Sequence, residues 1–125
     1  NGYVLWPTLL YPYVKNINVY NCPSNTYKWT GGYTGSSCYG YLSICSGQAM
    51  ASFSQPSNTL CIYDVKTQGG FSNHYAPTPG TVALGYLDSG FSDLHSEGAN
   101  ALFADGHVKW FKQNAALSNR TMWQL

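Results

Sequence analysis

The sequence predicts a single α+β domain with a small antiparallel β-sheet, short helical segments and long irregular loops. Short runs of residues alternate between apolar and polar, which is the pattern of half-buried strands. Gly, Ser, Thr, Asn and Pro are frequent between these runs, and they favour turns and loops. A chain of 125 residues is long enough for one modest core. We therefore expect one domain over residues 1–125.

The first third of the chain predicts little regular structure. Pro7 can occupy the first turn of a helix, and Pro12 would end or kink one, so a brief helix or turn is expected near 8–14. A strand-like piece follows at 17–22. Residues 23–37 are rich in Gly, Ser, Thr and Asn, and they predict a loop.

The middle of the chain predicts two strands. Residues 38–45 alternate and carry aromatic rings, and residues 59–65 form a short apolar run. The intervening residues 46–58 predict a loop or one helical turn. Residues 66–94 are rich in Gly and Pro and predict an irregular segment, within which 81–87 is a candidate strand.

The clearest local signal is a hairpin over residues 100–111. Asp105-Gly106 lies between two apolar runs, which indicates a two-residue type I′ turn. That register pairs Phe103 with Val108 and Ala101 with Trp110, and it puts all four side chains on one face, expected to be the core. The tail from residue 112 predicts a docked coil or short helix.

Composition excludes several function classes. Charged residues make up 9% of the chain, against about 25% in an ordinary soluble domain. The net charge is +1 and no Lys/Arg cluster occurs, so a nucleic-acid footprint is absent. Low charge also leaves little repulsion between copies of the chain. No run of 18 apolar residues occurs, which excludes a membrane span in this sequence. Because Asn1 stands within what the pattern indicates is a folded segment, we expect an upstream segment that was cleaved, omitted or not ordered.

Four cysteines, Cys22, Cys38, Cys45 and Cys61, lie in the first half of the chain. None forms a Cys-x-x-Cys pair, which disfavours a zinc ribbon or a thioredoxin site. An even number in a small, charge-poor domain predicts two disulfides in an oxidising compartment, and the alternative is four free buried thiols. Three pairings are open. Sequential pairing would close two short loops, each stabilising by about 3 kcal/mol.

A resemblance rests on the segment HSEGANALFADGHVKW, residues 95–110. Nine residues separate His95 from Asp105, and Gly106 follows. This spacing resembles the prepilin-type processing-associated H-X9-DG family of bacterial pilin-like proteins. Further positions agree with that motif, as do the upstream pieces WPTLLYPYVKN, NCPS, CYGY and TLCIYD. The matching positions are Gly98, Asn100, Phe103, Ala104, His107 and Val108.

The chain departs from the family pattern in four respects. Leu94 replaces the usual basic residue before the histidine, and Glu97 stands at the first of two usual glycines. The cleavage motif and the apolar spine helix of the family do not occur in this sequence.

The resemblance implies a bacterial pilin-like or pseudopilin-like head, exposed at the cell surface or secreted. It implies a structural role in an extracellular filament, through contact with copies of itself, and no catalysis. Candidate subunit contacts are the large apolar residues near the two termini. They are Trp6, Tyr11, Tyr13, Trp123 and Leu125.

Titratable residues give a few candidate ligands. His95, Asp105 and His107 could bind a metal, but Asp105 is explained by the turn and His95 by a backbone contact. Asp64, Asp88, Asp93 and Glu97 could hold a calcium ion, although no EF-hand-like loop occurs. Solvated or capping carboxylates are the simpler interpretation, so no cofactor is expected. The sequence contains no Gly-x-Ser-x-Gly motif, and an enzyme is not expected.

The alternative function is a secreted carbohydrate-binding module. It would use exposed rings that stack on sugars, and the candidates are Trp29, Tyr33, Tyr75 and Tyr86. Asn119-Arg120-Thr121 fits an N-glycosylation sequon, so glycans are also a candidate modification.

Overall fold

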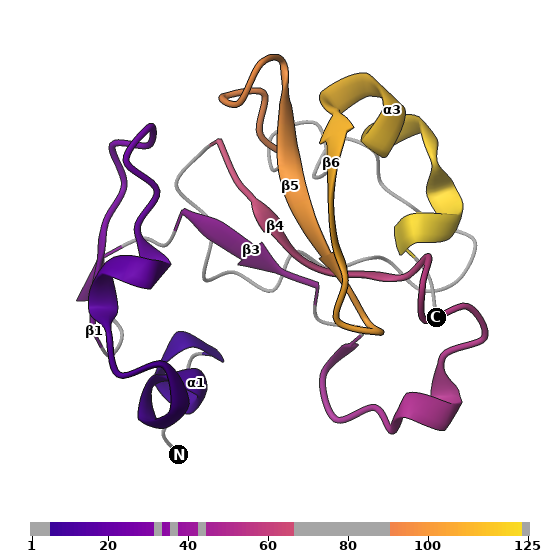
Figure 1. The fold of residues 1–125 in the computed structure, drawn as a ribbon, viewed down its shortest axis with the longest axis horizontal. Helices are drawn as coiled ribbons and strands as arrows, with labels where there is room; N and C mark the ends of the chain where they lie inside the picture. The colour runs from indigo at the N-terminus through magenta and orange to yellow at the C-terminus, as the bar shows by residue number, and fades with distance from the viewer. Residues whose placement is uncertain (1–5, 32–33, 36–37, 43–44, 67–90, 124–125) are drawn as a thin grey trace.

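A computed structural model describes residues 6–31, 34–35, 38–42, 45–66 and 91–123 of the chain. Its centre is a four-stranded antiparallel sheet with the strand order β3-β4-β5-β6 (Figure 1). The strands are β3 (Tyr39–Tyr41), β4 (Leu60–Asp64), β5 (Gly98–Phe103) and β6 (Val108–Lys112). A separate two-stranded hairpin joins β1 (Trp29–Gly31) to β2 (Thr34–Gly35). The expected α+β class is therefore confirmed.

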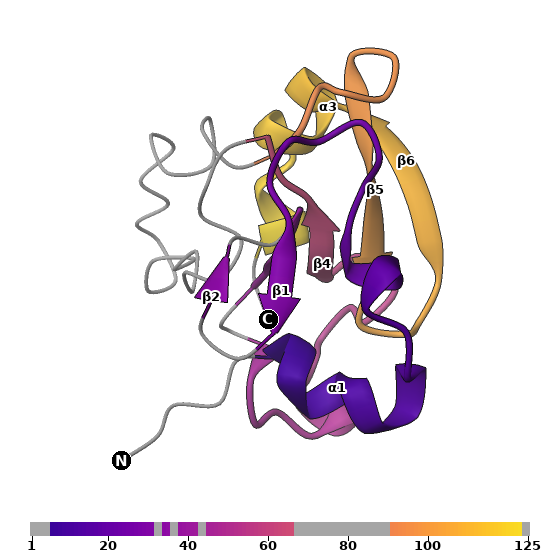
Figure 2. The same cartoon turned by 90° about the vertical axis from the view of Figure 1, so that its left-hand side faces the viewer.

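Short helices flank the sheet. They are α1 (Trp6–Val14), η3 (Met50–Ser52) and α3 (Gln113–Ser118), with 3₁₀ turns η1 (Ile17–Tyr20) and η4 (Arg120–Trp123). Figures 1 and 2 show α3 close to β5 and β6, with α1 at the far end of the molecule. None of the helices in the described part of the chain could span a lipid bilayer.

The core lies on the face of the sheet that α3 and η4 cover. Ala99, Ala101 and Phe103 of β5 point into it because alternate residues of a strand share one face. Tyr63 stacks on Phe91 with ring centroids 5.8 Å apart. The buried set is Leu42, Leu60, Tyr63, Val65, Phe91, Ala99, Ala101, Phe103, Ala116, Met122 and Trp123.

A second, smaller aromatic cluster joins α1 and η1 to the sheet. Trp6 contacts Tyr20 edge-on at 6.0 Å and Tyr41 of β3 at 6.3 Å, measured between ring centroids. Tyr20 in turn meets Trp29 at 4.9 Å. These rings hold the N-terminal helices against the β3 end of the sheet.

Helix α1 matches the brief helix expected near 8–14, with Pro12 inside it. The helix ends two residues after Pro12. Lys15 then adopts a left-handed φ of 55°, and its N–H donates to the Tyr11 carbonyl at 2.8 Å. This is the geometry of a helix C-terminus that stops on an αL residue.

Two expectations for the first third are wrong. Residues 17–22 hold the η1 turn and no strand, because the side chain of Asn16 accepts a hydrogen bond from the Asn18 N–H at 3.0 Å and starts a turn. The expected loop 23–37 contains the short β1–β2 hairpin.

The remaining expectations agree with the structure where it describes the chain. Strands β3 and β4 lie within 38–45 and 59–65, and η3 is the helical turn expected in 46–58. The tail forms α3 and η4. The candidate strand 81–87 lies outside the described residues.

The hairpin between β5 and β6 forms, but its predicted turn and register are wrong. Gly106 N–H donates to the Phe103 carbonyl, and Phe103 N–H donates to the His107 carbonyl, each at 2.9 Å. With Gly106 at φ 93°, this is a three-residue loop that closes on a glycine bulge. Leu102 therefore pairs with Val108, one residue away from the expected register.

A tighter turn lies just before β5. Ser96 and Glu97 both have positive φ, 58° and 65°, and His95 and Gly98 exchange two backbone hydrogen bonds around them. Positive φ at both central residues is the signature of a type I′ turn. The type I′ turn that the sequence predicts at Asp105-Gly106 thus occurs instead at Ser96-Glu97, where neither central residue is glycine.

Candidate functional site

The most prominent surface feature is the face of the sheet opposite the core. Ile62, Leu102 and Val108 lie side by side on it, because Ile62 pairs with Leu102 and Leu102 pairs with Val108. Trp110 continues this row on β6. The exposed fraction is 62% for Val108 and 44% for Trp110. These side chains form what we call the open face.

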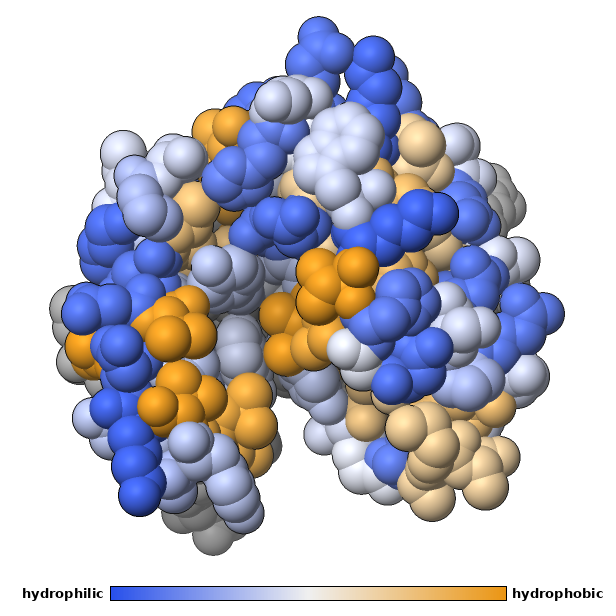
Figure 3. Space-filling view, viewed as in Figure 1, coloured by the Kyte–Doolittle hydropathy of each residue, from blue (hydrophilic) through white to orange (hydrophobic). Residues whose placement is uncertain are grey.

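A groove of about 280 Å³ runs along the open face. Its lining is mostly apolar, and its polar members are gathered at one end. Figure 3 shows a hollow at the centre of the molecule, with apolar side chains on both sides of it. The groove is lined by Tyr39, Ile62, Tyr63, Asp64, Asn100, Ala101, Leu102 and Val108.

A second apolar surface lies on α1. Leu9 is 59% exposed and Tyr13 is 85% exposed. They are four residues apart, so they share one side of the helix with Leu10 and Val14, which are also exposed. We call these four residues the α1 stripe. The described part of the chain covers Leu10 and Val14 in part and leaves Leu9 and Tyr13 mostly exposed.

The polar end of the groove centres on Asp64. Its Oδ2 accepts hydrogen bonds from the Asn100 backbone N–H at 2.8 Å and from Asn100 Nδ2 at 3.3 Å. Burial raises the pKa of Asp64, and the Asn100 N–H opposes that rise. Burial likewise raises the pKa of the adjacent Tyr39 to about 12, with the nearby Asp64 carboxylate adding to the effect.

His95 lies beside this carboxylate and holds the turn before β5. Its Nε2 is 3.7 Å from Asp64 Oδ2 and 3.4 Å from Cys22 Sγ. Its carbonyl accepts a hydrogen bond from Trp110 Nε1 at 2.9 Å. The backbone groups of His95 bond to the hairpin backbone at Gly98, whereas its ring contacts the side chains of Asp64 and Cys22.

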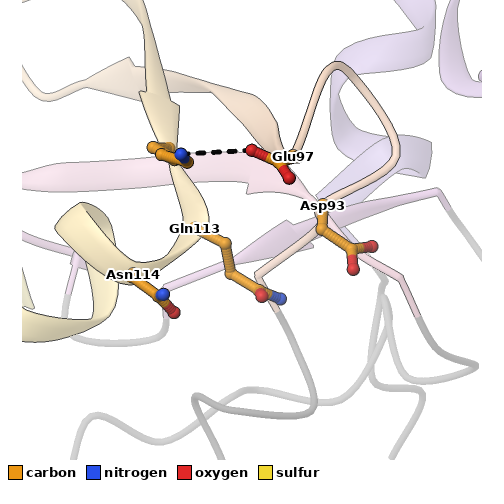
Figure 4. A pocket seen from close by; sticks show the side chains of 5 residues that line it. Asp93, Glu97, Gln113 and Asn114 are labelled. Carbon is orange, nitrogen blue, oxygen red and sulfur yellow. Dashed lines mark ion pairs between the residues drawn. The ribbon is translucent and has the colours of Figure 1, made fainter.

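A polar pocket of about 290 Å³ lies between the β5 turn and the start of α3. It is lined by Asp93, Glu97, Lys112, Gln113 and Asn114 (Figure 4). Glu97 pairs with Lys112 at 3.1 Å and Asp93 with Lys66 at 2.7 Å. The Lys66 hydrogen bond lowers the pKa of Asp93. Since a lysine already pairs with each carboxylate, the pocket is not arranged for a cation.

The candidate metal ligands are separated. Asp64 and Asp93 have the different partners just described, Glu97 has Lys112, and Asp88 lies outside the described residues. Asp105 and His107 contact each other at 2.6 Å on the exposed turn, away from His95. Among the residues that the structure describes, no three His, Cys, Asp or Glu side chains are grouped to hold a metal.

The remaining residues of the motif between His95 and Val108 pack within the β5–β6 hairpin or form its turns. Gly98 lies directly under Phe111 and Trp110, with no room for a side chain. Phe103 stacks on His107 with centroids 4.4 Å apart. The hydrogen bond from the His107 N–H lowers the pKa of Asp105. The motif thus builds both turns of the β5–β6 unit.

Two candidate surface rings are buried. Trp123 is 1% exposed and donates from Nε1 to the Ala116 carbonyl at 2.9 Å, so its assignment as a subunit contact is wrong. Trp29 is 3% exposed and cannot stack on a sugar. Both rings fill apolar clusters instead.

The other candidate contacts differ in exposure. Tyr11 and Tyr13 remain on the surface. Trp6 is half-buried against Tyr20 and Tyr41. Leu125, and the candidate rings Tyr33, Tyr75 and Tyr86, lie outside the described residues.

The sequon residue Asn119 follows α3. Its Oδ1 accepts a hydrogen bond from Thr121 Oγ1 at 2.7 Å, and Thr121 also accepts one from Asn58. Glycosylation of Asn119 stays a prediction.

The four cysteines are thiols in this structure and lie in two pairs. Cys45 Sγ and Cys61 Sγ are 2.8 Å apart. Cys38 Sγ lies 2.8 Å from the Cys22 backbone nitrogen.

Sequence reasoning missed the open face. Val108 and Trp110 were assigned to the core through the wrong turn, and Lys109 between them supported that assignment, because alternation would turn the lysine outward. In the structure Lys109 pairs with the core residue Ala101 instead. A one-residue shift of register moves every β6 side chain to the other face.

Comparison of the chain with protein-family models, curated proteins and solved structures finds no match.

Proposed function

We propose that this chain is a structural subunit of an extracellular bacterial filament, of the pilin-like or pseudopilin-like kind, which acts by self-association. The observation that carries the proposal is the presence of two separate apolar surfaces, the open face and the α1 stripe. The motif-level resemblance supplies the filament class and the location at the cell surface.

The chemistry of the two surfaces favours contact between copies. Exposed apolar patches rimmed by polar residues mark interaction sites. The 9% charge content leaves little electrostatic repulsion when copies approach each other.

The geometry favours a head-to-tail arrangement. A contact between two different patches of the same protein repeats in one direction and forms an open filament when it does not close into a ring. The α1 stripe is convex and the open face is grooved, so the stripe of one copy is the occupant that we assign to the groove of the next.

Edge-to-edge pairing of sheets is a weaker route. Strand β6 is an edge strand, and Lys109 and Lys112 lie along it. Lysines on an edge strand oppose pairing with another chain. The faces, and not the edges, are therefore the surfaces that we assign to assembly.

Analytical ultracentrifugation and negative-stain microscopy test the proposal. Val108→Lys should break the open face, and Tyr13→Ser should break the α1 stripe, so each should shift the chain toward monomer. Met50→Ser is the matched control, because Met50 is 58% exposed but lies on η3, outside both surfaces.

Mixing the two variants gives the decisive result. Each variant retains one intact surface, so an equimolar mixture should form dimers and no filaments if the contact is head-to-tail. Wild-type protein that stays monomeric at high concentration, or variants that assemble as well as Met50→Ser, would contradict the proposal.

A further inference from the structure

The cysteine pairs lie at opposite ends of β3. Cys38 immediately precedes this strand, while Cys45 returns beside its far end through a turn in which the Cys45 N–H donates to the Leu42 carbonyl at 3.0 Å. Leu42 in turn donates to the Cys61 carbonyl at 2.8 Å. Strand β3 thus separates a Cys22–Cys38 site from a Cys45–Cys61 site.

Register excludes the crossed pairings. Cys38 lies opposite Val65, since the Val65 N–H donates to the Cys38 carbonyl at 2.8 Å. Cys61 is four residues from Val65 along extended chain, which is about 13 Å at ~3.3 Å per residue. A disulfide needs Cα atoms about 4.4–6.8 Å apart, so Cys38 reaches neither Cys61 nor its neighbour Cys45.

We propose that the four cysteines oxidise to two disulfides with sequential pairing, Cys22–Cys38 and Cys45–Cys61, and that Cys45–Cys61 is the pair open to thiol–disulfide exchange. This inference does not depend on filament assembly.

The two pairs differ in access. Cys22 and Cys38 are 5% and 1% exposed. Cys45 and Cys61 are half-buried, so a small-molecule disulfide can reach them. Their Sγ atoms are 2.8 Å apart, so a thiolate on either sulfur accepts the proton of the other, and this hydrogen bond stabilises the thiolate that attacks a disulfide.

The exchange balances with a small-molecule disulfide as oxidant. One thiolate of the pair attacks one sulfur of oxidised glutathione, forms a mixed disulfide and releases one glutathione thiolate. The other cysteine then loses its proton and attacks the protein sulfur of the mixed disulfide, which forms the Cys45–Cys61 bond and releases the second glutathione. Two electrons pass to the oxidant, and the two protons go to the released thiolates.

Peptide mapping of the folded chain tests the pairing. The chain is equilibrated with oxidised glutathione, blocked with iodoacetamide and digested without reduction. Trypsin cuts after Lys28, between Cys22 and Cys38, and chymotrypsin cuts after Tyr41 and Phe53, which separates Cys38, Cys45 and Cys61. The expected products join Cys22 to Cys38 and Cys45 to Cys61. The same oxidation in guanidinium is the control, and it should give all three pairings.

Kinetics and one variant test the exchange. With limiting oxidant, the Cys45–Cys61 peptide should appear first. Cys45→Ser should trap glutathione on Cys61 and still form Cys22–Cys38, because the resolving thiol is missing. Crossed peptides from the folded chain, earlier formation of Cys22–Cys38, or four free thiols after equilibration with excess oxidant would each overturn the proposal.

Discussion

Gly98 is the position at which one added methyl group should do most damage. A Cβ built on Gly98 would collide with the Phe111 carbonyl oxygen and would lie 2.5 Å from Trp110 Cζ2. The backbone of Gly98 is not left-handed, so glycine is needed here for space and not for its conformational freedom.

The expected loss in the free energy of unfolding of Gly98→Ala depends on which atoms the added Cβ meets. Overpacking costs about 1–3 kcal/mol when side chains can move. Since one colliding atom belongs to the backbone of β6, we expect the upper end, about 3 kcal/mol. For a chain of this length, that corresponds to a fall in Tm of about 12 °C.

Urea denaturation and thermal melting followed by circular dichroism measure the effect. Gly106→Ala is the control: Gly106 has φ 93° but nothing within 4 Å of a Cβ, so only the left-handed strain of about 1–2 kcal/mol applies. Adding Trp110→Ala should rescue Gly98→Ala only in part, because the carbonyl collision remains. A Gly98→Ala protein as stable as wild type would refute the reasoning.

Three further predictions concern single side chains. Glu97→Gly should raise the free energy of unfolding by about 1 kcal/mol in urea, because relief of the left-handed strain outweighs loss of the exposed ion pair with Lys112. The raised pKa of Asp64 means that its ionisation opposes folding. Wild type should therefore lose stability relative to Asp64→Asn as pH rises from about 4 through that pKa, as urea titrations at several pH values would show. Trp123→Ala should cost about 3–5 kcal/mol by calorimetry, because it empties the core beside Ala116.

The sequence predicted the elements whose signals are local. The strands at 38–45 and 59–65, the short helix around Pro12 and the β5–β6 hairpin all follow from alternation and turn chemistry. The strand expected at 17–22 failed because one side-chain hydrogen bond, from Asn18 N–H to Asn16, outcompeted the strand preference of Ile and Val.

The candidate site was harder to predict because it depends on contacts far apart in sequence. Asp64, His95 and Cys22 come together through packing of three separate segments, and no spacing rule links them. Trp110 and Trp123 are the same residue type, so residue type does not distinguish them. The packing of η4 on the core buries Trp123, whereas Trp110 stays exposed.

The open face exists because the loop between β5 and β6 has one residue more than the two-residue turn that the sequence predicts. Asp105-Gly106 is compatible with a two-residue turn, which would have placed Val108 and Trp110 in the core. The chain uses a three-residue loop instead, and the Ala104 N–H donates to the Thr59 carbonyl at 2.9 Å, which fixes the loop against the segment before β4. The Gly106–Phe103 and Phe103–His107 backbone hydrogen bonds close this loop, and the closure places Leu102 opposite Val108. That register turns Val108 and Trp110 outward, so the proposed assembly surface depends on loop hydrogen bonds that lie outside the surface itself.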